Sequence, residues 1–107
     1  MKVKELLSNG FELVCGDEDK IIKGCYIGDL LSLAMSKVTK DNAWVTIQSN
    51  INIVAVASLM EAGCIIICDG FSPDAGVVER ASLQEVTILK TELSAFETAK
   101  ILIENKV

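Results

Sequence analysis

Histidine is absent from this 107-residue chain, and that absence excludes the commonest forms of nucleophilic catalysis. Serine–histidine and cysteine–histidine mechanisms need an imidazole to take the proton from the nucleophile, so only lysine-based variants remain open. The chain also lacks a Gly-x-x-x-x-Gly-Lys-Ser/Thr loop, which excludes a P-loop kinase. Nothing in the sequence alone names a reaction.

Clusters of basic residues are missing as well. Ten Lys and Arg residues are scattered among fifteen Asp and Glu residues, and the formal net charge is −5. A protein that neutralises nucleic-acid phosphates needs a basic patch, and so does one that binds anionic lipid through a polybasic segment. We therefore expect neither a nucleic-acid partner nor a membrane partner.

No hydrophobic run is long enough for a membrane span of about 20 apolar residues. The most apolar region, Ile51–Cys68, is interrupted by Asn52, Ser58, Glu61 and Gly63. The first residues pass directly into an amphipathic pattern, without the basic region and cleavage site of a secretory signal. We expect a cytoplasmic protein.

The four cysteines, Cys15, Cys25, Cys64 and Cys68, lack the spacing of a disulfide framework, and buried reduced thiols are the simplest interpretation. On a strand, Cys64 and Cys68 would lie about 13 Å apart along the chain, too far to share a zinc ion. Without histidine to complete a ligand set, we expect no metal site and no cofactor.

Three apolar runs define the expected fold. They lack the alternation of a half-exposed strand, and each leads into small polar residues and then a helical pattern: Ala43–Ile47, Cys64–Cys68 and Val86–Leu89. Such runs are typical of parallel strands covered by helices on both faces. The sequence predicts an α/β fold, a three-layer-like domain with a mainly parallel sheet and helical crossovers, with these strands as neighbours.

The N-terminal part is expected to add a hairpin-like segment. Phe11–Cys15 and Ile21–Ile27 both suit strands, and the acidic turn between them, Asp17–Asp19, favours a hairpin in which Cys15 and Cys25 face each other. The length leaves room for one core, so residues 1–107 are expected to form a single domain.

Helix starts are predicted from capping residues. Asp29 is placed to cap a helix, Ser72–Pro73 gives a capping hydroxyl before a proline, and Ser94 with Glu97 fits a capping box. The helix over Ile51–Ala62 is apolar almost all round and is expected to be the most buried. The expected buried faces of the first and last helices are Leu31, Met35 and Val38, and Phe96, Ala99 and Ile103.

Polar residues follow each predicted parallel strand. Because crossovers in parallel sheets leave from one edge, these residues should gather at the carboxyl ends of the strands, where helix N-termini favour anions. The candidate ligand-binding residues are Gln48, Ser49, Asn50, Asn52, Asp69, Gly70, Ser72, Thr91 and Ser94. Such residues usually serve only as caps and turn formers, but Asn50 and Asn52 behind Gln48 exceed what one cap requires.

Several blocks of the chain resemble the DRTGG domain family. Asp19-Lys20 followed by Lys23-Gly24-Cys25-Tyr26-Ile27-Gly28-Asp29-Leu30-Leu31-Ser32 resembles its signature, with Lys20, Lys23 and Cys25 in place of the usual arginine, threonine and glycine. Trp44–Gln48, Asn52–Ala57 and Thr91–Glu97 resemble its other blocks. The likeness covers nearly the whole chain.

The resemblance implies an α/β domain similar to the N-terminal domain of HPr kinase/phosphorylase, without the kinase domain. Such domains occur beside CBS modules, in some phosphotransacetylases and near iron-only hydrogenase genes, which implies a regulatory or ligand-sensing role. We therefore expect a non-catalytic domain that binds a small, possibly phosphorylated, metabolite or a protein partner. The alternative is a small enzyme that uses Asp29, Asp69 and a lysine. The high apolar content of a short chain favours a homodimer.

Overall fold

The computed structural model describes all residues from Met1 to Val107. One five-stranded sheet has the order β1-β5-β4-β3-β2. Its strands are β1 (Phe11–Cys15), β2 (Cys25–Ile27), β3 (Ala43–Thr46), β4 (Cys64–Ile67) and β5 (Ile88–Thr91). Strands β2, β3, β4 and β5 run parallel, and only β1 is antiparallel. The predicted parallel neighbours β3, β4 and β5 are therefore confirmed.

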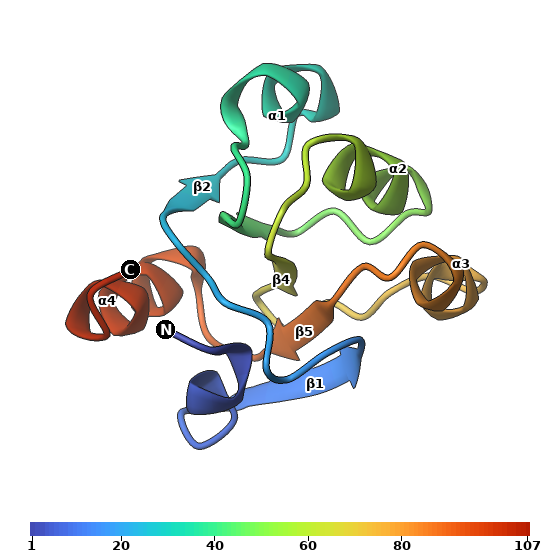
Figure 1. Cartoon of the computed structure of the whole chain (residues 1–107). Helices are drawn as coiled ribbons and strands as arrows, with labels where there is room; N and C mark the ends of the chain where they lie inside the picture. The colour runs from blue at the N-terminus through green and yellow to red at the C-terminus, as the bar shows by residue number, and fades with distance from the viewer.

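Helices cover both faces of the sheet and make three layers. A short 3-10 helix (Val3–Leu6) precedes the sheet, and the α-helices are α1 (Leu31–Lys37), α2 (Asn52–Leu59), α3 (Val77–Leu83) and α4 (Ala95–Glu104). Figure 1 shows α1, α2 and α3 along one side of the sheet, with α4 and the N-terminal segment on the other. The α/β class with a mainly parallel sheet and helical crossovers is confirmed.

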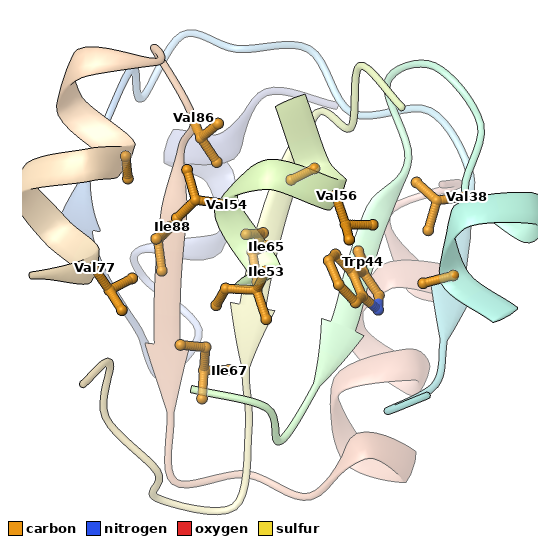
Figure 2. Close-up of a cluster of buried hydrophobic side chains, with 13 residues drawn as sticks. Val38, Trp44, Ile53, Val54, Val56, Ile65, Ile67, Val77, Val86 and Ile88 are labelled. Atoms are coloured by element: carbon orange, nitrogen blue, oxygen red, sulfur yellow. The ribbon is translucent and has the colours of Figure 1, made fainter. Parts of the chain in front are cut away.

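Two apolar cores result from the alternation of side chains along the strands. On the side of α1, α2 and α3, Trp44, Ile65 and Ile88 pack against Ile53 and Val54 of α2 (Figure 2). On the other side, the neighbouring residues of the same strands pack against Leu102 of α4 and against the N-terminal segment. Each central strand is thus buried on both faces, which is why its sequence shows no alternation.

The N-terminal hairpin prediction is wrong. Strand β1 pairs with β5 and strand β2 pairs with β3, so the two strands lie at opposite edges of the sheet. Between them, the chain is tied to distant segments by hydrogen bonds from Ile22 N to Met1 O and from Lys23 N to Asp41 O. A strand's local pattern indicates extended backbone but not its partner. Cys15 and Cys25 consequently do not face each other.

Two predicted caps are also wrong. Leu30 occupies the N-cap position of α1 without a side-chain cap, because Asp29 points its carboxylate toward β3 instead. Helix α3 begins after Gly76, whose φ of 85° is left-handed, so Ser72–Pro73 belongs to the preceding loop. The capping box of Ser94 and Glu97 is confirmed at the start of α4.

The structure confirms only part of the predicted buried helix faces. Helix α2 buries Ile53, Val54, Val56 and Ala57, more residues than any other helix, as expected. In the last helix, however, Phe96 is 81% exposed and Ile103 is 71% exposed, whereas Thr98 and Leu102 are buried. In the first helix, Val38 is buried at the C-cap but Met35 is 48% exposed, and the buried helical residue is Ala34.

None of the helices combines the length and the apolar character that a membrane crossing requires.

Candidate functional site

The loops after β3, β4 and β5 meet at the carboxyl edge of the sheet through hydrogen bonds. Ser49 Oγ donates to Asp74 Oδ1 at 3.0 Å and joins the loop after β3 to the loop after β4. Asp69 N donates to Leu93 O at 2.8 Å, and Gly70 N donates to Thr91 O at 3.0 Å. These two bonds join the loop after β4 to the end of β5. The predicted residues thus lie along one continuous edge.

Asp29 organises the half of this edge nearest to β2. Its Oδ1 accepts from Thr46 Oγ1 and from Ile47 N, both at 2.8 Å, and its backbone carbonyl accepts from Gln48 Nε2 at 2.9 Å. The sequence interpretation gave Asp29 a capping role or a catalytic one in the alternative enzyme. The geometry instead makes it the anchor between the loop after β2 and the end of β3.

The amide side chains after β3 bond to one another. Asn50 Nδ2 donates to Gln48 Oε1 at 2.9 Å, and Asn50 Oδ1 accepts from Asn52 N at 2.9 Å. Asn50 therefore satisfies a free N–H at the start of α2, as a capping residue does. The Asn52 side chain is exposed and makes no hydrogen bond, which leaves it free for a ligand. Ser94 likewise serves its own helix through the capping box.

A cavity of about 150 Å³ lies at the other half of the edge, beside β5 and β1. Among the predicted residues, Gly70, Ser72 and Thr91 line it. The remaining lining residues were not predicted: Gly10, Glu12, Phe71, Lys90 and Glu92. Gly10 and Glu12 were missed because the hairpin hypothesis placed β1 away from β5. Phe71, Lys90 and Glu92 stand next to predicted residues in the sequence. Their positions near the ends of β4 and β5 were the only features that could have predicted them as lining residues.

A tight turn keeps the cavity open. Phe71 N donates to Cys68 O at 3.3 Å and closes a four-residue turn. Its central residues, Asp69 and Gly70, both have left-handed φ values, 59° and 77°, as a type I′ turn requires. A Cβ at Gly70 would lie 2.5 Å from Glu92 Oε2. Glycine at this position thus provides both the turn conformation and the space beside the carboxylate.

Thr91 forms the base of the cavity. Only 5% of its surface is exposed, and its Oγ1 donates to Gly10 O at 2.7 Å while accepting from Leu93 N at 3.2 Å. One hydroxyl therefore fixes three segments: the start of β1, the end of β5 and the approach to α4. A change in the shape of the cavity would therefore shift all three segments.

The charges in the cavity come from one lysine and two glutamates. Lys90 Nζ lies 3.6 Å from Glu12 Oε2, with side-chain exposures of 35% and 69%. Such a solvated ion pair is worth little and can exchange partners. The Glu92 carboxylate has neither an ion-pair partner nor a hydrogen bond, and the Ser72 hydroxyl is also without an intramolecular partner. The cavity thus offers a cation, two anions, a hydroxyl and the half-exposed ring of Phe71.

The cysteines do not provide an activated nucleophile. Cys25 is exposed at the edge strand β2 and Cys15 is half-buried, so the expectation of buried thiols holds only for Cys64 and Cys68. Partial desolvation nevertheless raises the pKa of Cys25 to about 11, and burial together with the Asp69 carboxylate raises that of Cys68 to about 11. Burial also raises the pKa of Cys15 and of the fully buried Cys64. All four groups are therefore neutral thiols near pH 7, and thiols attack and bind metals poorly compared with thiolates. No group of three or more histidine, cysteine or carboxylate residues has metal-site geometry.

Comparison with solved structures identifies a similar fold in the CBS and DRTGG domains of the regulatory region of Clostridium perfringens pyrophosphatase, complexed with its activator, diadenosine tetraphosphate. The TM-score is 0.65 at 13% identity, over 92% of this chain and 43% of that one. The chain thus spans less than half of that region. A comparison with curated proteins finds no significant match.

A scan against protein families matches residues 6–104 to the DRTGG domain. The match includes every strand of the sheet and all four α-helices. It also includes every residue that lines the cavity and the hydrogen-bonded loops beside it. The chain therefore belongs to the DRTGG domain family.

Proposed function

We propose that this chain is a non-catalytic regulatory domain that senses a small molecule at the carboxyl edge of its sheet. The observation that carries the proposal is the cavity between the turn after β4 and the end of β5, which is lined by the half-exposed Phe71 and by the side chains of Glu92 and Ser72, neither of which has an intramolecular partner. In open α/β sheets, this edge is where ligands bind. A similarly folded protein, a regulatory region complexed with a nucleotide activator, also supports a ligand-sensing role.

The arrangement favours sensing over catalysis. The cysteines are neutral thiols, and the carboxylate of Asp29 is occupied by Thr46 and Ile47. The cavity is bounded by backbone from separate segments, which Thr91 ties together. A ligand there would stabilise the contact between β1 and β5, and a partner or neighbouring domain would sense that contact.

A thermal-shift screen of the purified chain tests the proposal, with nucleosides, nucleotides, phosphorylated metabolites and amino acids as probes. A probe present at 100 times its dissociation constant should add about 2.7 kcal/mol of stability. For a chain of 107 residues this corresponds to a rise in Tm of about 12 °C. Glu92→Gln should remove the rise, whereas Glu104→Gln, an exposed carboxylate at the end of α4, should not. A screen in which no probe raises Tm would contradict the proposal.

We further propose that the domain acts as a homodimer. Large apolar side chains are exposed on several elements, including Leu83 at 76%, Phe96 at 81% and Ile103 at 71%. Single exposed apolar residues are ordinary, but Phe96 and Ile103 stand on the same short helix of a chain with a high apolar content. Light scattering coupled to size exclusion should give twice the monomer mass, and Phe96→Glu should lower it toward that of the monomer.

A further inference from the structure

We infer that the cavity beside β5 takes a small zwitterion, an α-amino acid, with its carboxylate on Lys90 and its ammonium group on Glu92. The inference rests on the proposed function, because it assigns a ligand class to the same cavity. It differs from the expectation of a phosphorylated ligand that the sequence suggested. The size of the cavity, its charges and the positions of its lining residues support it.

The size of the cavity favours a ligand no larger than an amino acid. Its volume is about 150 Å³, whereas pockets for drug-sized molecules measure about 300–1,000 Å³. A dinucleotide would lie mostly outside it.

The charge balance favours a ligand that carries both signs. Lys90 is the single cation among the lining residues, and the two anions are Glu12, which lies 3.6 Å from it, and Glu92. A free phosphate would be attracted by one lysine but repelled by two carboxylates, one of which has no partner. A simple amine would be attracted by the carboxylates but repelled by the lysine. A zwitterion satisfies both, because its carboxylate can replace the solvated Glu12 on Lys90 and its ammonium group can bind the unpaired Glu92.

Both charged residues that would hold the ligand come from the end of one strand. Lys90 belongs to β5 and Glu92 is the first residue after it; both line the cavity, whereas the Thr91 side chain between them donates to Gly10 O. Because the two residues are two positions apart in the chain, their Cα atoms lie at most about 7 Å from each other. Both side chains can therefore reach one small ligand, each through a charge-assisted hydrogen bond.

Phe71 and Ser72 complete the recognition. Phe71 is the one hydrophobic lining residue, and 48% of its surface is exposed. Its ring can cover an apolar ligand side chain, and the Ser72 hydroxyl can donate to the ligand carboxylate. Because the turn at Asp69 and Gly70 fixes the loop that carries both residues, this side of the cavity is formed before a ligand arrives.

The test uses the whole chain and the twenty L-amino acids, one at a time, in a thermal-shift assay followed by calorimetry. At least one amino acid should raise Tm. Its N-acetyl derivative and its decarboxylated amine should bind at least about tenfold more weakly, since each loses one charged end. Glu92→Gln and Lys90→Met should each weaken binding by about tenfold or more, and the matched variants Glu104→Gln and Lys100→Met should leave it unchanged.

Three outcomes overturn the inference: no amino acid binds, the analogues bind as well as the amino acid, or the cavity variants behave like their controls. Adenosine, AMP, diadenosine tetraphosphate and sugar phosphates are run in parallel. If one of these binds and loses affinity in Glu92→Gln, the proposed sensing function stands and the amino-acid assignment falls. If nothing in either set binds, both fall.

Discussion

Asp29 should be the most important polar residue for the stability of the carboxyl edge, although its own side chain is near the surface. Asp29→Ala leaves the Thr46 hydroxyl, 1% exposed, without its acceptor, and it also frees Ile47 N. A stranded buried hydroxyl costs about 1–2 kcal/mol, and the Ile47 N–H can regain water because that residue is 39% exposed. We therefore expect a loss of about 2 kcal/mol in the free energy of unfolding.

Urea denaturation and differential scanning calorimetry measure this loss. With an unfolding entropy of about 2.1 cal/mol/K per residue, a loss of about 2 kcal/mol lowers Tm by about 9 °C. Asp29→Asn keeps an acceptor oxygen and should cost about half as much. Asp74→Ala, which removes only the exposed contact to Ser49, is the matched control and should cost about 0.5 kcal/mol or less.

A double-mutant cycle separates this anchoring role from a helix cap. If Asp29 acts through Thr46, Asp29→Ala and Thr46→Val should be coupled by about 1 kcal/mol or more. If Asp29 acts by capping α1, as its position in the sequence suggested, the two changes should be additive. Additivity, or a loss below about 0.5 kcal/mol for Asp29→Ala, would show that Asp29 does not stabilise the protein through Thr46.

Three further predictions concern caps, an unpaired hydroxyl and a buried thiol. Ser94→Ala should lower the unfolding free energy by about 1 kcal/mol, because the capping box is lost. Asn52→Ala should change it by less than about 0.5 kcal/mol, because the Asn52 side chain makes no hydrogen bond. Equal losses for the two variants in urea titrations would contradict this. Thr98→Val should raise the unfolding free energy by about 1 kcal/mol, because the Thr98 hydroxyl is buried without a partner; a destabilised variant would show that it has one. Burial raises the pKa of Cys64, so its contribution to stability is fully present below the unfolded-state pKa of about 8.5 and is lost as pH rises above it. Between pH 8 and pH 10 the wild type should therefore lose about 1–2 kcal/mol more than Cys64→Val, and parallel losses would contradict this.

The central strands could be predicted from the sequence because burial on both faces removes alternation. Cys64–Cys68 is apolar at every position, and the structure buries all of it. The edge strands could not be placed in the same way. Phe11–Cys15 has the pattern of a strand, but its partner β5 is more than 70 residues away in the chain, and no local signal specifies that pairing.

The site was predicted in position and only partly in composition. Polar residues after parallel strands do lie on one edge, yet most of those after β3 are engaged with one another. The cavity depends on Gly10 and Glu12, which reach it only through the β1–β5 pairing. The last helix shows the same limit: the sequence pattern placed Phe96 in a buried stripe, but α4 packs on the sheet through Leu102 and buries Thr98 instead.

The most direct test of ligand sensing at the carboxyl edge is an amide nitrogen–proton correlation spectrum recorded while the amino acids, and separately AMP and diadenosine tetraphosphate, are titrated in. We expect at least one probe to move the amide signals of Gly70, Phe71, Ser72 and Glu92 before any others. Ligand sensing at this edge would be contradicted if no probe moved these signals. It would also be contradicted if the shifts lay at the other end of the strands, around Gly16 and Asp17.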